Sequence, residues 1–342
     1  MNLARKLLGS DTEMSALVNE LLECMPHLIA EEESLDPALW DKALLDPARD
    51  IMGRSGKELR ARFLERCWHI ASGGNAGPPA MLPALIELLH VGSLVIDDIE
   101  DDSPTRRGEP ALHRRYGVPL ALNTGNWLSF LPFALLSRVE LDSELRLAIY
   151  DNISLALLRC HQGQALDLSI KVTSLPQRRV SSVVGCATRL KTGSLMELAA
   201  FLGARAAGAP PQLLTALVRF GRDFGVGLQM LDDWSGIAVE ARRAKGIEDI
   251  RLARPTWPWA WLADECDEIT FAGIVHDARS VSIDWEAERL IGRLRDQLAS
   301  IPRTRIHEYL ERALDDVRAA LDDSSNFELL REDVRRLENA YG

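Results

Sequence analysis

The stretch LLHVGSLVIDDIEDDSPTRRGEP, residues 88–110, joins an apolar run to a dense group of acids and then to two arginines. Apolar residues fill most sides of segment 82–96, which predicts a buried helix. Asp97 and Asp101 are four residues apart, so they share one face near the end of that helix, with Asp98 beside them. Because like charges at this spacing repel, the pattern favours a divalent cation that offsets the repulsion. Mg²⁺ typically binds through one or two carboxylates plus substrate phosphates.

The alternative interpretation of this first aspartate cluster is an acidic helix end that frays into solvent. The buried helix before it, and Arg106 and Arg107 after it, favour the metal site.

A second aspartate cluster supports the same interpretation: LQMLDDW, residues 228–234, again ends an apolar helical stretch. Here Asp232 and Asp233 stand together, but Gly236 occupies the position of a third carboxylate.

The apolar period is helical along most of the chain, and strand alternation bounded by hairpin signals is missing. The sequence therefore predicts an all-α protein, with residues 1–342 as a single domain. A first amphipathic stripe lies at 17–28. Further helices are expected near 57–72, 119–139, 143–169, 179–207, 211–235, 257–266, 284–299 and 304–321.

Composition excludes several classes of protein. Asp and Glu number 51 against 40 Lys and Arg, a net charge of -11 that disfavours general nucleic-acid binding. Five scattered cysteines without a CxxC pair argue against a disulfide framework or a zinc site, and predict a reducing, cytoplasmic location. No apolar run reaches the ~20 residues that span a bilayer, and no signal peptide is expected.

Six segments, in order, resemble the trans-isoprenyl diphosphate synthases, most closely the geranylgeranyl diphosphate synthase branch. They are GKELR (56–60), the run from 88 to 117, HQGQALDL (161–168), KTGSL (191–195), LQMLDDW (228–234), and the KGIEDI and PTWP elements within 245–258. The resemblance implies an all-α bundle around a deep central cavity, usually a homodimer. It also implies a Mg²⁺-dependent prenyltransferase of isoprenoid biosynthesis, with three ions per site, that joins an allylic diphosphate to isopentenyl diphosphate.

The resemblance assigns a role to each matching residue. Asp97, Asp98, Asp101, Asp232 and Asp233 would bind Mg²⁺. Arg106, Lys191 and Lys245 would hold the allylic diphosphate, while Lys57, Arg60, His90 and Arg107 would hold isopentenyl diphosphate. Thr192 and Gln229 would steady the developing cation and its leaving group, with Gln164 and Asp167 as supports.

Three departures from the family pattern leave other activities open. Gly236 removes a carboxylate, Ala253-Arg254 stands where Gly-Lys is usual, and Trp234, Trp257, Trp259 and Trp261 crowd the second cluster. Aromatic faces can stabilise cations, so these tryptophans suggest a terpene cyclase or a prenyltransferase with a non-standard acceptor, or they simply pack. A catalytically silent partner subunit is a third reading, which the largely intact aspartate clusters disfavour.

Product length is expected to depend on the helix that carries Asp97. Gly92 and Ser93 lie about one turn before it and are small, whereas the fifteen-carbon synthases commonly carry a bulky aromatic there. The growing chain would then be stopped by Leu89 and by Trp127 or Phe130 from the following helix, which predicts a twenty-carbon product, geranylgeranyl diphosphate. A longer product is the alternative if Trp127 points away. The alternative is that Gly92 and Ser93 only allow close helix packing.

Overall fold

The computed structural model describes residues 36–74, 76–138, 141–321 and 324–341. The helix predicted from the stripe at 17–28 lies outside these residues. Within them the chain is almost entirely helical, and its only strands are the dipeptides β1 (Thr105–Arg106) and β2 (Glu109–Pro110). The all-α prediction is confirmed.

The chain divides into two compact units, residues 1–152 with 199–210, and residues 153–198 with 211–342. Two of the boundaries fall inside continuous helices, α9 (Ser143–Ser169) and α11 (Ser194–Ala206). The expectation of a single domain stays a prediction.

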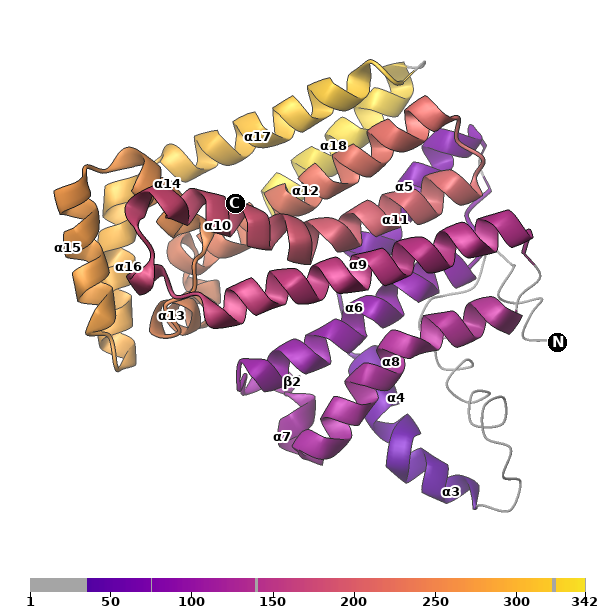
Figure 1. Cartoon of the computed structure of the whole chain (residues 1–342), viewed down its shortest axis with the longest axis horizontal. Helices are drawn as coiled ribbons and strands as arrows, with labels where there is room; N and C mark the ends of the chain where they lie inside the picture. Colours follow the sequence, from indigo (N-terminus) through magenta and orange to yellow (C-terminus); the bar gives the residue numbers. More distant parts are fainter. Residues whose placement is uncertain (1–35, 75, 139–140, 322–323, 342) are drawn as a thin grey trace. The chain divides into compact units, whose positions relative to one another are not determined.

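The first unit is built on α6 (Met81–Glu100), a helix buried on most sides that packs along α8 (Val118–Arg138) (Figure 1). Their contact depends on two glycines. A Cβ at Gly92 would lie 2.8 Å from the carbonyl oxygen of Gly125, and one at Gly125 would lie 3.1 Å from that of Gly92. The backbones can approach this closely only because both positions lack a side chain.

The other elements of the first unit surround this pair of helices. They are α3 (Pro37–Trp40), the π-helix η1 (Asp41–Leu45), α4 (Asp46–Gly53), α5 (Leu59–Ser72), the strands β1 and β2, α7 (Leu112–Tyr116), the beginning of α9 and the end of α11. On α9, the Tyr150 hydroxyl donates to the Phe133 carbonyl of α8 at 2.9 Å, and the two rings stack.

The second unit is built on α12 (Pro211–Ala238), whose buried face includes Phe220, Phe224, Leu228 and Leu231. The helices α17 (Ile301–Arg318) and α18 (Ser324–Tyr341) pack on it (Figure 1). The remaining elements are η2 (Val172–Ser174), α10 (Gln177–Thr188), η3 (Arg189–Gly193), η4 (Glu240–Arg242), α13 (Arg243–Arg251), α14 (Trp257–Glu265), α15 (Glu268–Arg279) and α16 (Asp284–Leu298).

The helix predicted at 179–207 is three elements in the structure. The π-helix η3 separates α10 from α11 and carries Lys191 and Thr192. π-Helical turns inside α-helices often mark functional sites, and this one carries two candidate site residues.

Candidate active site

A tight hairpin positions the two arginines that follow the first aspartate cluster. Thr105 pairs with Pro110 and Arg106 with Glu109, so Arg107 and Gly108 form a two-residue turn. Both have positive φ, 55° and 82°, as a type I′ turn requires. The residues here carry no recognised hairpin signal, because an arginine occupies a position that usually carries asparagine, aspartate or glycine.

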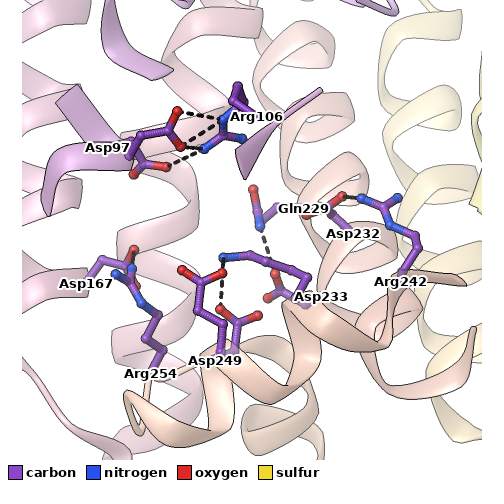
Figure 2. Close-up of polar contacts among 12 residues, drawn as sticks. Asp97, Arg106, Asp167, Gln229, Asp232, Asp233, Arg242, Asp249 and Arg254 are labelled. Atoms are coloured by element: carbon purple, nitrogen blue, oxygen red, sulfur yellow. Dashed lines mark hydrogen bonds and ion pairs between the residues drawn. The ribbon is translucent and has the colours of Figure 1, made fainter. Parts of the chain in front are cut away.

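Arg106 forms hydrogen bonds to Asp98, the second aspartate of the first cluster. Its Nε donates to Oδ1 at 2.8 Å and to Oδ2 at 3.1 Å, and its Nη2 donates to Oδ1 as well. Asp98 is 1% exposed, and burial raises its pKa even though Arg106 opposes the shift. Asp97 is only partly buried, and its Oδ2 lies 3.7 Å from Arg106 Nη2 (Figure 2). Asp101, at the C-cap of α6, is also partly exposed.

Four residues of the first unit, Lys57, Arg60, His90 and Arg107, are termed the cationic cluster. The structure brings Arg60 Nη1 to 3.0 Å from His90 Nε2. Burial and the charge of Arg60 hold the pKa of His90 well below its usual range, so the ring is neutral. Because a guanidinium can only donate, His90 Nε2 accepts this hydrogen bond and the ring proton is on Nδ1.

Arg107 joins the segment 56–60 to the hairpin. Its Nη1 donates to the Arg54 carbonyl at 2.8 Å, and Arg54 Nη1 donates to the Arg106 carbonyl at 3.1 Å. A Cβ at Gly56 would lie 2.8 Å from the Arg107 guanidinium, so the glycine of GKELR makes room for it. Lys57, next in sequence, is exposed.

Glu87 belongs to this region and was missed by sequence reasoning. It lies on α6, is 5% exposed, and has one buried side-chain oxygen, Oε1, without a hydrogen-bond partner in the described structure. Burial raises its pKa, and the charges of Arg60 and Arg107 oppose that shift. The available signal was an acid inside an apolar run, three residues before His90.

The residues expected to set product length differ in their burial and in the space around them. Gly92 is buried against α8, and a Cβ there would lie 2.7 Å from Ser129 Oγ. Because α8 backbone occupies the space that a side chain at Gly92 would need, the structure favours the close-packing interpretation of this position. Leu89 is 1% exposed, whereas Ser93 and Trp127 are partly exposed.

In the second unit, the π-helix η3 places Lys191 against α9. A Cβ at Gly163 would lie 2.7 Å from the Lys191 backbone nitrogen, so the glycine of HQGQALDL allows this approach. Lys191 Nζ lies 3.1 Å from Asp167 Oδ2, and Arg254 Nη1 donates to the same oxygen (Figure 2). Asp167 thus orients two cations, while Gln164 lies on the same helix and is partly exposed.

A chain of hydrogen bonds leads from Thr192 to the second aspartate cluster. Thr192 Oγ1 donates to Gln229 Oε1 at 2.7 Å. Gln229 Nε2 in turn donates to Asp233 Oδ1 at 2.7 Å, as Figure 2 shows. The Trp257 backbone N–H donates to Asp233 Oδ2 at 3.0 Å. Burial and the charge of Asp249 raise the pKa of Asp233 to about 8.

Asp232 and Lys245 complete the second cluster. Asp232 accepts a hydrogen bond from Arg242, and Lys245 Nζ lies 3.1 Å from Asp249 Oδ1 (Figure 2). Burial lowers the pKa of Lys245, but the charges of Asp249 and Glu248 and the hydrogen bond to Asp249 together raise the pKa overall. Sequence reasoning missed Arg242 and Asp249, although Lys245 and Asp249 have the i, i+4 spacing of a helical ion pair.

Gly236 is required for packing between α12 and α13. A Cβ at Gly236 would lie 3.0 Å from the Gly246 backbone nitrogen, and one at Gly246 would lie 2.3 Å from the Gly236 carbonyl oxygen. The missing third carboxylate therefore reflects a close helix contact. An aspartate at this position would push the two helices apart.

The tryptophans near the second cluster pack against each other. Trp234 is 6%, Trp259 1% and Trp261 2% exposed, and the Trp234 and Trp261 rings meet edge to face. Trp257 stacks at a tilt on Trp261, and its Nε1 donates to Thr188 Oγ1 at 3.1 Å. These contacts favour the packing interpretation over an aromatic lining for a cyclase.

Comparison with known proteins agrees with this arrangement. The model of the polyprenyl synthetase family matches residues 41–276. The chain belongs to this family of trans-isoprenyl diphosphate synthases. Over 220 residues it is 30% identical to a geranylgeranyl diphosphate synthase of Methanosarcina mazei, a match that covers 64% of this chain and 67% of that protein.

Solved structures show the same fold over nearly the whole chain. The geranylgeranyl pyrophosphate synthetase of the archaeon Geoglobus acetivorans has a TM-score of 0.74 at 26% identity, covering 95% of this chain and 98% of that one. A decaprenyl diphosphate synthase of Rhodobacter capsulatus has a TM-score of 0.76 at 20% identity, covering 99% and 98%. The second likeness supports the isoprenoid synthase fold alone.

Polyprenyl synthetases generally use Mg²⁺ and act on allylic and isopentenyl diphosphates, and the donor groups here suit that metal. Among the described residues no group of three or more acids, histidines or cysteines forms a metal cage. Each cluster instead offers one or two partly exposed carboxylates, which fits an ion whose coordination is completed by phosphate oxygens and water.

In the described residues, no helix combines the length and apolarity that a bilayer crossing requires.

Proposed function

We propose that this polyprenyl synthetase condenses an allylic diphosphate with isopentenyl diphosphate to a linear trans-polyprenyl diphosphate, and that its product is geranylgeranyl diphosphate. The observation that carries the proposal is the cationic cluster. A cyclase has no need of a second diphosphate site, yet Arg60, His90 and Arg107 are held in place here by specific contacts.

In this proposal, the partly exposed carboxylates Asp97, Asp101 and Asp232 hold Mg²⁺, three ions in all in the loaded site. The metal supplies positive charge that stabilises the departing diphosphate. Asp98 and Asp233 are positioning residues that do not bind the metal: Asp98 orients Arg106, and Asp233 orients Gln229.

The cations around Asp167 and Asp249 hold the allylic diphosphate. Lys191 and Lys245 each face a carboxylate that fixes the ammonium group, and Arg106 adds a fork suited to phosphate oxygens. Positive charge fixed in advance lowers the barrier to breaking the allylic carbon–oxygen bond.

The carbon–carbon bond then forms from the double bond of isopentenyl diphosphate. As the allylic carbon–oxygen bond breaks, its electrons leave with diphosphate, and the alkene electrons of isopentenyl diphosphate bond to the allylic carbon. The adjacent methylene loses a proton to the departed diphosphate, which restores a double bond. Gln229 and Thr192 present their oxygens to the positive charge that develops.

The proposal is tested with the purified full chain, Mg²⁺, farnesyl diphosphate and labelled isopentenyl diphosphate. A labelled twenty-carbon diphosphate supports it. A cyclic hydrocarbon, or no incorporation of label, contradicts it.

In the same assay Arg60→Ala should raise the Michaelis constant for isopentenyl diphosphate more than that for the allylic substrate, with exposed Arg62→Ala as the control. Equal effects on both substrates would mean that the cationic cluster is assigned to the wrong ligand.

Product length is best tested at Ser93. It lies four residues before Asp97, is partly exposed, and donates through Oγ to the His90 carbonyl at 2.8 Å. Ser93→Phe should shift the main product to fifteen carbons while condensation continues. An unchanged product would place the end of the chain-binding site elsewhere.

We also propose a homodimer in the cytoplasm. Phe130 on α8 is 68% exposed, and Leu147 and Leu158 on α9 are 61% and 64% exposed. The two leucines are eleven residues, about three turns, apart on one helix and so share a face. Large exposed apolar side chains of this kind favour an interface with a second copy.

A further inference from the structure

Asp232 already has a cationic partner within the second unit. Arg242 ends the short helix η4, ten residues after Asp232, and its Nη2 donates to Asp232 Oδ1 at 2.5 Å (Figure 2). Both side chains are partly exposed, 34% for Arg242 and 26% for Asp232. The pair therefore lies within reach of ions in solution.

The C-terminal helix holds Arg242 from the other side. The Arg242 guanidinium carbon lies 4.8 Å from the centroid of the Tyr341 ring, a cation–π contact. Tyr341 is in the last turn of α18, and that helix is anchored by the buried side chains of Phe327, Leu330, Val334 and Leu337. The position of the guanidinium thus depends on two elements far apart in sequence.

No other carboxylate of this cluster is as available as Asp232. Both Asp233 oxygens accept hydrogen bonds, from Gln229 and from the Trp257 backbone, and position 236 is a glycine. A divalent cation at this cluster must therefore bind Asp232, where the guanidinium already lies.

We propose that Arg242 is a resident counter-ion of Asp232 that Mg²⁺ must displace, and that Tyr341 holds the guanidinium beside Asp232 until this exchange. The inference rests on the proposed function for the assignment of Asp232 as a metal ligand. It makes the second cluster the weaker metal site and couples its occupancy to the docking of the C-terminal helix.

The test is direct metal binding to the full-length chain. Mn²⁺, a paramagnetic substitute for Mg²⁺, is titrated with saturating inorganic diphosphate, and free Mn²⁺ is counted by electron paramagnetic resonance. Arg242→Gln should tighten the weakest Mn²⁺ site about fivefold, the factor that corresponds to losing a partly exposed ion pair of ~1 kcal/mol. Neighbouring Arg243→Gln, which loses only a hydrogen bond to the Ile237 carbonyl, should change nothing.

Variants of Tyr341 provide a second, milder test. Tyr341→Leu should tighten the same site about twofold, whereas Tyr341→Phe keeps the aromatic face, loses only the hydrogen bond between the Tyr341 hydroxyl and Arg242, and should tighten the site less. Unchanged or weaker Mn²⁺ binding in Arg242→Gln overturns the inference, and weaker binding would make Arg242 a diphosphate ligand instead.

Asp232→Asn separates this inference from the proposed function. It should abolish the weakest Mn²⁺ site, and retention of that site would overturn the inference by placing the metal elsewhere. Neither result depends on whether the chain elongates isoprenoids, which the labelled condensation assay decides by itself.

Discussion

Asp97 and Asp232 are the first aspartates of their clusters, and each is the more available member of its pair. Their side chains are 22% and 26% exposed, whereas Asp98 is held by Arg106, and Asp233 by Gln229 and the Trp257 backbone. A buried carboxylate that is already satisfied by donors gains little from a metal ion. We therefore propose that the first aspartate of each pair is a metal ligand and that the second fixes the groups around it.

Replacing Asp97 with asparagine tests this division. Asp97→Asn keeps the shape of the side chain but removes its charge, so turnover should fall by about a hundredfold or more, the scale for losing a principal source of charge stabilisation. Asp102→Asn is the matched control, because Asp102 belongs to the same acidic run but its side chain is 80% exposed. Steady-state kinetics at saturating Mg²⁺ measures both, and near-normal turnover in Asp97→Asn would contradict the metal assignment.

Glu87 gives a prediction for the pH dependence of stability. Because burial raises its pKa, the folded chain binds the Glu87 proton more tightly than the unfolded chain does. This contribution to stability is complete below the usual glutamate pKa and is lost as pH rises through the raised value. Glu87→Gln cannot ionise, so its free energy of unfolding should increase relative to that of the wild type as pH rises above the usual glutamate pKa of about 4. Urea denaturation at several pH values measures this, and a constant difference between the two proteins would contradict it.

The sequence identified the acids and bases that belong to motifs, and missed those whose importance comes from their surroundings. Asp97, Asp232 and His90 stand out by spacing on apolar helices. Glu87 and Arg242 do not, because one depends on burial beside arginines and the other on a tyrosine almost a hundred residues away.

At the scale of single elements, the sequence predicted several of the long helices, but length alone did not decide which. The helix expected at 143–169 is α9 with the same bounds. The 18-residue helix α18 was not predicted, because its apolar residues form one narrow stripe in a mostly charged segment. Nor were α15 and the π-helix η3, whose hydrophobic period differs little from that of its neighbours.

The end of α13 carries a strained residue that the sequence had marked as unusual. Ala253 has φ of +52°, its N–H donates to the Ile250 carbonyl, and the Arg254 N–H donates to the Asp249 carbonyl. This is the hydrogen-bond pattern of a Schellman C-cap, in which glycine is preferred at the position of Ala253. The turn also directs Arg254 toward Asp167.

Ala253→Gly should therefore stabilise the protein by about 1 kcal/mol, because glycine adopts the left-handed conformation without the steric cost of a Cβ. Chemical denaturation would measure the change. The matched control is Ala216→Gly, inside α12, where glycine should destabilise instead. A loss of stability in Ala253→Gly would mean that the alanine methyl group contributes packing that outweighs the strain.

At the scale of the whole molecule, the helical period predicted the fold class, but the internal organisation came only with the structure. Contacts divide the chain into two units whose boundaries cross α9 and α11, and no composition change marks those positions. The first cluster and the cationic cluster belong to one unit, whereas the second cluster with Lys191 and Lys245 belongs to the other. Such a division depends on long-range packing, which local periodicity does not encode.

The proposed homodimer gives a prediction for the molecule as a whole. Phe130 is the most exposed large apolar residue of α8, so a second copy would cover it, and Phe130→Glu would place a charge in that contact. Ile269→Glu is the matched control, because Ile269 on α15 is 86% exposed and belongs to neither α8 nor α9. Light scattering after size exclusion should give the mass of two chains for the wild type and Ile269→Glu, and of one chain for Phe130→Glu at low micromolar concentration. If Phe130→Glu keeps the wild-type mass, α8 lies outside the interface, and the exposed face of α9 with Leu147 and Leu158 becomes the surface to alter.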